Sequence, residues 1–125
     1  MATSMDSTKP MTVKIADTTV ACSNIVVSND RHAITVSMEI KNIDKSSLLL
    51  SINNFCLQQE SYESYAQHCY ISDGQSFEVM SGWKSFLKDK NYTLIMKYDV
   101  SPNLPSYHLC YKTTSETYLI TCLKS

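Results

Sequence analysis

Two pairs of histidine and cysteine are the residues of this sequence whose types are best suited to chemistry. His68 is followed directly by Cys69, and one residue separates His108 from Cys110. Imidazole and thiolate groups bind Zn²⁺, so these four side chains could form a zinc site. On a β-strand, however, His108 and Cys110 would share a face, whereas His68 and Cys69 would point to opposite faces. All four cannot converge without a bulge, so we expect packed thiols and surface imidazoles, with no bound metal or other cofactor.

Nucleophilic catalysis by a Cys–His–Asp set is conceivable for a chain with five cysteines and three histidines. No local signature singles out one cysteine, and no predicted helix begins beside any cysteine to lower its pKa. Glu60 and Glu63 form the closest pair of acids in a polar stretch, where solvated carboxylates are the usual finding. We therefore expect a protein without enzymatic activity.

Aromatic side chains offer a second kind of chemistry, the binding of another protein. The longest polar insert, residues 60–67, is predicted to be a surface loop or one short turn, and it holds Tyr62 and Tyr65. Tyrosine gives a large contact area at a low cost in entropy. Glu60 and Glu63 would surround the rings with an acidic rim, which suits a partner with a basic surface. The alternative is that both tyrosines cap one open end of the domain.

Trp83 is a further candidate, either as an exposed anchor for a partner or as a plug in the core. Residues 83–90 are predicted to form a short helical turn, which would bring Trp83, Phe86 and Leu87 to one side.

Composition narrows the possible partners. The 125 residues carry a net charge of −1, so no electrostatic feature favours nucleic acid or an anionic membrane. Only two glycines are present, which excludes glycine-rich phosphate-binding loops. The length predicts one domain over residues 11–125 after a flexible leader at residues 1–10. The sequence does not indicate an oligomeric state.

The cysteines and the N-terminal residues bear on the cellular compartment. An odd number of cysteines without a Cys-x-x-Cys spacing favours free buried thiols, with one or two disulfides as the alternative. The first nine residues include no apolar signal segment, and no apolar run approaches eighteen residues. As given, the chain is predicted to be cytoplasmic; a mature fragment would instead be secreted or surface-anchored.

Alternating apolar residues predict two strong β-strands with one buried face each. In residues 33–43 and 91–100 the buried sets are Ile34, Val36, Met38 and Ile40, and Tyr92, Leu94, Met96 and Tyr98. Further strands are predicted at 12–15, 20–27 (with a kink or bulge), 47–52 (continuing as 55–59 after a break or bulge at Asn53-Asn54), 68–71, 76–80, 106–111 and 116–123. Asp73-Gly74 predicts a hairpin turn. About seven to nine antiparallel strands fit a β-sandwich or a small barrel, and the sandwich is the simpler arrangement.

Residues 20–100 resemble bacterial immunoglobulin-like domains found on lipoproteins and secreted antigens. The resemblance is carried by Ile34-Thr-Val-Ser-Met-Glu-Ile-Lys-Asn42, Asp44-Lys-Ser46, Phe55-Cys-Leu57, Asp73-Gly74 and Tyr92-Thr-Leu-Ile-Met-Lys-Tyr98. It implies an immunoglobulin-like antiparallel β-sandwich and no particular activity. The chain departs from that group in its many cysteines and in lacking a lipobox cysteine. It also has Met38 and Met96, rather than cysteines, at the expected core positions.

Three functions fit these observations. The first is a non-catalytic module that binds another protein through aromatic loops. The second is a small inhibitor encoded by a phage or mobile element that docks on a host defence complex. The third is a secreted or surface-anchored immunoglobulin-like domain in mature form. Counting free thiols separates the third from the others, because an oxidising compartment favours disulfides.

Overall fold

A computed structural model describes residues 11–15, 17–29, 33–59, 62–80, 82–99 and 106–124. Within these residues the chain is all-β apart from one 3₁₀ turn. The elements are β1 (Met11–Ile15), β2 (Thr18–Asn29), β3 (Ile34–Asn42), β4 (Ser47–Ser51), η1 (Ile52–Asn54), β5 (Phe55–Gln59), β6 (Tyr62–Ser72), β7 (Phe77–Val79), β8 (Trp83–Leu87), β9 (Asn91–Tyr98), β10 (Ser106–Lys112) and β11 (Thr117–Lys124). The predicted leader at residues 1–10 lies outside the described residues.

The two strands with the clearest alternation lie side by side in the sheet. β3 and β9 pair antiparallel with Met38 opposite Leu94, and β9 also pairs with β6 on its other side. Alternate residues of both strands are buried, and Met38 and Met96 are completely so. The predicted core positions of these strands are therefore confirmed.

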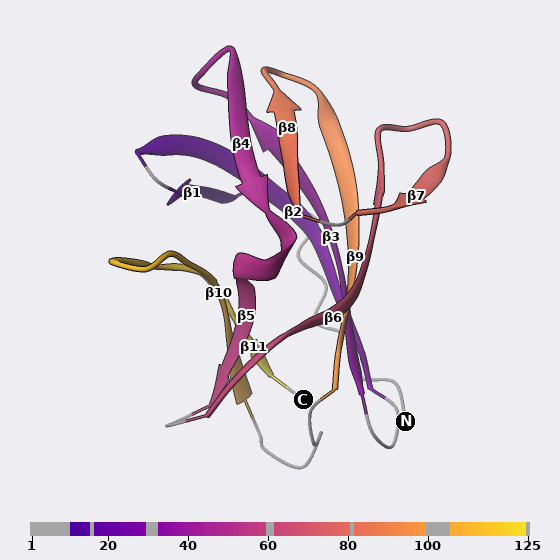
Figure 1. Ribbon diagram of the computed structural model, residues 1–125, viewed down its shortest axis with the longest axis vertical. Coiled ribbons are helices and arrows are strands. Elements are labelled where there is room, and N and C mark those ends of the chain that lie inside the picture. Colours follow the sequence, from indigo (N-terminus) through magenta and orange to yellow (C-terminus); the bar gives the residue numbers. More distant parts are fainter. Residues whose placement is uncertain are drawn as a thin grey trace.

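All pairings between the strands are antiparallel, and they form one main sheet with a separate ribbon. The main sheet has the order β1-β2-β3-β9-β6-β5-β10-β11, with β7 attached to β6, while β4 and β8 form a two-stranded ribbon (Figure 1). β1 and β11, the two ends of this path, lie close together, so the sheet is nearly closed and barrel-like. The core inside it also receives Leu48, Leu50 and Phe86 from the ribbon.

β6 joins the two halves of the main sheet. Its first residues pair with β5, with Tyr65 opposite Cys56, and its later residues pair with β9, with Cys69 opposite Met96. The register shifts between Ala66 and His68, where one half gives way to the other. Figure 1 shows β6 running obliquely from β5 toward β7. A strand that changes neighbours at a bulge is a common way to turn a sheet corner.

Local signals in the sequence placed two irregularities correctly. The predicted bulge in β2 lies between Ser23 and Val26, where Asn24 has a φ of 51°. The predicted hairpin at Asp73-Gly74 joins β6 to β7, with Ser72 opposite Phe77. Gly74 has a φ of 108°, a conformation that residues with a Cβ rarely adopt.

Two predicted segments were wrong. Residues 62–67 belong to strand β6 rather than to a surface loop, because β5 supplies partners for their backbone that the polar side chains do not reveal. Residues 83–87 form strand β8, paired with β4, rather than a helical turn. Phe86 is consequently buried, while Trp83 and Leu87 lie on the exposed face. The described residues form eleven strands, more than the expected seven to nine, partly because β8 is an additional strand.

A buried asparagine ties the ribbon to the main sheet. The Asn42 side chain is fully buried at the end of β3. Its Nδ2 donates to the carbonyl oxygens of Lys45 at 2.7 Å and Phe86 at 3.0 Å. Its Oδ1 accepts from the backbone N–H groups of Asp44 and Lys45 at 3.1 and 3.2 Å. One side chain thus holds the β3–β4 turn and strand β8 in a fixed relation to each other.

Candidate binding surface

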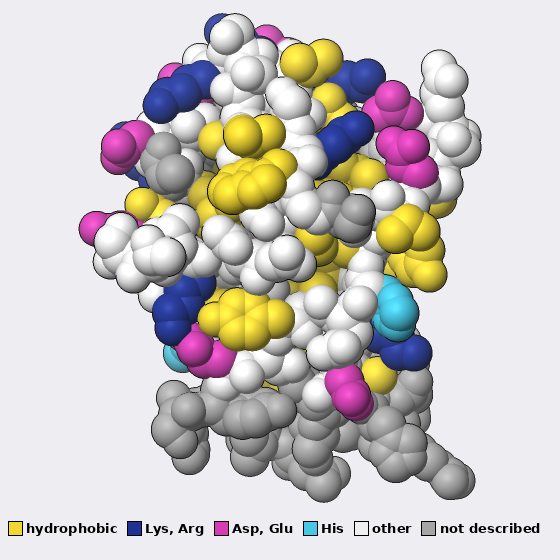
Figure 2. Space-filling view, viewed as in Figure 1, with side chains coloured by type: hydrophobic (Ala, Val, Ile, Leu, Met, Phe, Trp, Pro, Cys, Tyr) yellow, Lys and Arg dark blue, Asp and Glu magenta, His cyan; other side chains and the backbone are white. Residues whose placement is uncertain are grey.

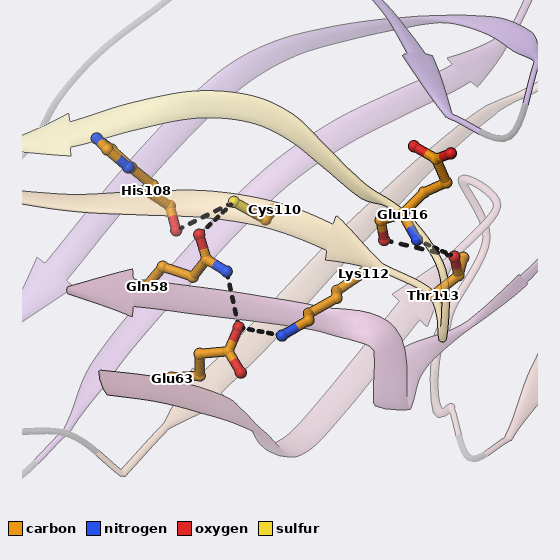
Figure 3. Close-up of polar contacts among 7 residues, drawn as sticks. All are labelled: Gln58, Glu63, His108, Cys110, Lys112, Thr113 and Glu116. Carbon is orange, nitrogen blue, oxygen red and sulfur yellow. Dashed lines mark hydrogen bonds and ion pairs between the residues drawn. The ribbon is translucent and has the colours of Figure 1, made fainter. Parts of the chain in front are cut away.

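Glu63, one of the two carboxylates of the predicted acidic rim, is paired within the chain. Glu63 Oε2 lies 2.6 Å from Lys112 Nζ and accepts a hydrogen bond from Gln58 Nε2 at 2.7 Å (Figure 3). We call Gln58, Glu63 and Lys112 the polar cluster; they come from β5, β6 and β10. Glu60 lies outside the described residues. Of the two carboxylates that favoured a partner with a basic surface, Glu63 is already paired, and Glu60 is not described.

Electrostatics within the polar cluster favours the charged forms of both partners. The hydrogen bond from Lys112, together with the one from Gln58, lowers the pKa of the Glu63 carboxyl group. The same contact with Glu63 raises the pKa of the Lys112 ammonium group. Because each charge is compensated inside the protein, this cluster has little unsatisfied charge to offer a ligand.

Tyr65 lies beside the polar cluster on the same strand as Glu63. Its side chain is 41% exposed and lines a shallow pocket of about 280 Å³ together with Asn54, Lys112, Thr113 and Thr114. Partial burial, and the nearby charge of Glu63, raise the pKa of its hydroxyl group. Tyr62 pairs through its backbone with Gln59, and its side chain lies outside the description. Tyr65 is thus accessible but already surrounded by polar side chains.

A second surface is apolar and lies on the ribbon. Leu49, Trp83 and Leu87 are 59%, 62% and 49% exposed. Leu49 stands opposite Ser85, the residue between Trp83 and Leu87 in the alternation, so all three apolar side chains occupy one face. We call these three residues the ribbon face. Figure 2 shows hydrophobic side chains gathered over β4 and β8.

The opposite face of the ribbon is firmly packed. Leu48, Leu50 and Phe86 are buried in the core. The Phe86 and Tyr92 rings meet edge to face with centroids 4.9 Å apart, and the backbone N–H of Leu87 donates to the Tyr92 hydroxyl at 3.3 Å. The ribbon face is therefore presented by a strand pair whose position is fixed from below.

Strand β7, which pairs with β6, carries two further exposed apolar residues. Phe77 and Val79 are 54% and 71% exposed and share one face of β7. Glu78 lies between them in sequence and forms an ion pair of 3.8 Å with Lys84 of β8, which links the two elements. Phe77 and Val79 thus form a separate exposed apolar pair, on the face of β7 that points away from Glu78.

Of the predicted binding residues, Tyr65 and Glu63 lie together on β6, whereas Trp83 lies apart from them on the ribbon. Sequence reasoning missed Leu49 and Leu87. A signal for Leu49 was present: Leu48, Leu49 and Leu50 are consecutive in a predicted strand, so the middle one must face away from its neighbours. The predicted helical turn did group Leu87 with Trp83, but it also included the buried Phe86, so the turn could not single out Leu87 as exposed.

Comparisons with known proteins give no further assignment. A scan against protein-family models, a search of curated proteins and a search of solved structures each returned no match. Among the described residues, no three or more His, Cys, Asp or Glu side chains are grouped so as to hold a metal ion. In the same part of the chain, no helix has the length and apolar character needed to cross a membrane.

Proposed function

We propose that this protein is a non-catalytic module that binds another protein through the ribbon face. The observation that carries the proposal is the presence of three large apolar side chains, Leu49, Trp83 and Leu87, on one exposed face of a well-anchored strand pair. Tryptophan is among the residues that contribute most to protein interfaces. Leucines beside it supply apolar area whose removal from water is favourable, at about 25 cal/mol per Å².

The chemistry of the ribbon face defines the partner that would fit it. Ser47, Ser51 and Ser85 lie opposite or between the apolar residues, so the face bears no charged side chain of its own. A protein with an uncharged apolar groove, deep enough to accept the Trp83 indole, would be complementary. The basic partner expected from Glu60 and Glu63 is less favoured, because Lys112 already neutralises Glu63.

The two alternative functions differ from the first in their biological setting, not in the surface that would bind the partner. A phage or mobile-element inhibitor and a secreted or surface-anchored domain could both use the ribbon face. An immunoglobulin-like sandwich also stays a proposal: two sheet halves joined at β6 support it, whereas the continuous, nearly closed strand path does not resemble two separate sheets. The cytoplasmic and secreted settings are separated by the number of free thiols in protein isolated from its source.

Affinity capture from the native source, followed by mass spectrometry, tests the proposal. The bait is the wild-type chain beside two matched variants, Leu49→Ser on the ribbon face and Leu119→Ser on β11, whose leucine is 53% exposed. We expect one captured protein to bind the wild-type chain and Leu119→Ser but not Leu49→Ser. Equal retention by both variants would contradict the proposal. If the capture recovers only further copies of this chain, and the molecular mass of the protein in solution rises with concentration, the ribbon face would instead mediate self-association.

A further inference from the structure

Two cysteines face each other across neighbouring strands of the main sheet. Cys56 of β5 is directly opposite Cys110 of β10 in an antiparallel pairing. Directly opposed residues in such a pair lie on the same face with Cα atoms about 4.5–5.5 Å apart. Disulfides span Cα separations of about 4.4–6.8 Å. The backbone therefore already holds these two residues at a separation that a disulfide can bridge.

The thiol pair lies on the outer face of the sheet, away from the core. Its neighbours in sequence, Phe55, Leu57 and Leu109, belong to the core cluster, and alternation places the two cysteines on the other face. Both cysteines are nonetheless buried. Residues of the same outer face flank them: Tyr65 stands opposite Cys56 in the pairing of β5 with β6, and Leu119 stands opposite Cys110 in the pairing of β10 with β11.

The polar cluster touches the thiol pair directly. Cys110 Sγ lies 3.6 Å from Gln58 Oε1 and 3.8 Å from the His108 carbonyl oxygen, within the range of weak thiol hydrogen bonds (Figure 3). Gln58, which contacts Cys110, and Tyr65, which stands opposite Cys56 and is 41% exposed, are therefore neighbours of the thiol pair on its outer side. Because the pair lies on the outer face, a reagent that displaces outer side chains reaches it without passing through the core.

Among the described residues, the other buried cysteines lack these features. Cys22 stands opposite Ile40 and Cys69 opposite Met96, and both cysteines belong to the core cluster. Burial raises the pKa of each of these two thiols to about 12. A hydrogen bond with Cys56 instead lowers the pKa of Cys110, while the pKa of Cys56 is raised, so the pair loses its first proton more readily than its second. The thiolate is the reactive form of cysteine.

We propose that Cys56 and Cys110 form a redox-modification site, a cross-strand dithiol that a low-molecular-weight disulfide such as oxidised glutathione converts to an intramolecular disulfide. The Cys110 thiolate attacks one sulfur of oxidised glutathione, forming a mixed disulfide and releasing one glutathione thiolate. Cys56 then attacks the Cys110 sulfur, which closes the protein disulfide and releases the second glutathione. The dithiol loses two electrons and two protons, and the two released glutathione molecules take them up.

Thiol counting with peptide mapping on the native 125-residue chain tests this site. After incubation with oxidised glutathione, we expect three of the five cysteines to titrate under denaturing conditions, and a mapped link between Cys56 and Cys110. Dithiothreitol should restore all five. Five free thiols after incubation, or a link that involves Cys122 or another cysteine, would overturn the proposal.

Two single variants test the order of attack. Cys56→Ser should accumulate a glutathione adduct on Cys110, because the resolving thiol is missing, whereas Cys69→Ser should form the disulfide as wild type does. A Cys56→Ser protein that folds, as judged by circular dichroism, yet carries no adduct on Cys110 would contradict Cys110 as the attacking thiol. If that variant does not fold, peptide mapping of the wild-type chain still decides whether the site exists.

Discussion

The polar cluster and the ribbon face differ in how far the protein satisfies its own side chains. In the polar cluster, Glu63 is bound by both Lys112 and Gln58, and Gln58 in turn meets Cys110. On the ribbon face, Leu49 and Trp83 are more than half exposed. Groups that already hold their partners gain little from a ligand, whereas apolar surface left in water gains from being covered. Unsatisfied apolar surface, rather than the presence of charged or aromatic residues, is therefore the basis of the proposed binding surface.

The largest expected effect is a difference in stability between substitutions on the two faces of the ribbon. Leu50→Ala removes a leucine that is 1% exposed and should lower the free energy of unfolding by about 3 kcal/mol, because it leaves a cavity. Leu49→Ala, one position earlier and 59% exposed, should cost about 1 kcal/mol or less. Urea denaturation of both variants measures the difference. Equal losses would mean that the outer face of the ribbon is packed as tightly as the inner one.

A smaller but still substantial effect should follow from removing the asparagine that positions the ribbon. Asn42→Ala leaves the Phe86 carbonyl oxygen and two backbone N–H groups without this partner, so we expect a loss of about 2–3 kcal/mol in the free energy of unfolding. Asn53→Ala, at an exposed position of η1, is the matched control and should change stability by about 0.5 kcal/mol or less. A loss for Asn42→Ala no greater than for the control would show that the ribbon is held by apolar packing alone.

The smallest effect concerns the pH dependence of the polar cluster. The lowered pKa of Glu63 makes its contribution to stability complete above the ordinary glutamate pKa of about 4.3, and that contribution is lost as pH falls through the folded-state pKa. The raised pKa of Lys112 acts at the other end: its contribution is complete below the ordinary lysine pKa and is lost as pH rises through the folded-state value.

Glu63→Gln tests this pH dependence. The wild-type chain should exceed Glu63→Gln in stability near neutral pH, and the difference should shrink toward both acid and alkaline pH. Unfolding midpoints measured across pH show the effect. Glu78→Gln is the control, because the Glu78–Lys84 contact is longer, at 3.8 Å, and more exposed. A Glu63→Gln difference that does not change with pH would rule out the ion pair as its source.

How much of the fold the sequence predicts depends on where each segment finds its partners. Alternation alone placed β3 and β9, because one face of each is buried and the other is not. The first part of β6 was missed because its backbone partners belong to β5 and its outward side chains, such as Glu63, are polar. β8 was missed because Trp83, Phe86 and Leu87 fit a helical spacing, and only pairing with β4 separates Phe86 from the other two.

The candidate site was predictable in part for the same physical reason. The sequence identified Trp83 and Tyr65 as aromatic candidates but could not tell an exposed anchor from one enclosed by polar neighbours. It also could not show that Glu63 would meet Lys112, which lies 49 residues away in the chain. The opposition of Cys56 and Cys110 depends on the register of β5 against β10, a long-range property that cysteine spacing does not encode.

The affinity of the captured partner for two aromatic variants tests the central claim most directly. Dissociation constants are measured by calorimetry for the wild-type chain, Trp83→Ser and Tyr65→Ser. If the ribbon face is the binding surface, Trp83→Ser should weaken binding about 30-fold or more, equivalent to about 2 kcal/mol, and Tyr65→Ser should change it less than about threefold. A strong loss for Tyr65→Ser with unchanged binding for Trp83→Ser would contradict the account and place the interface beside the polar cluster.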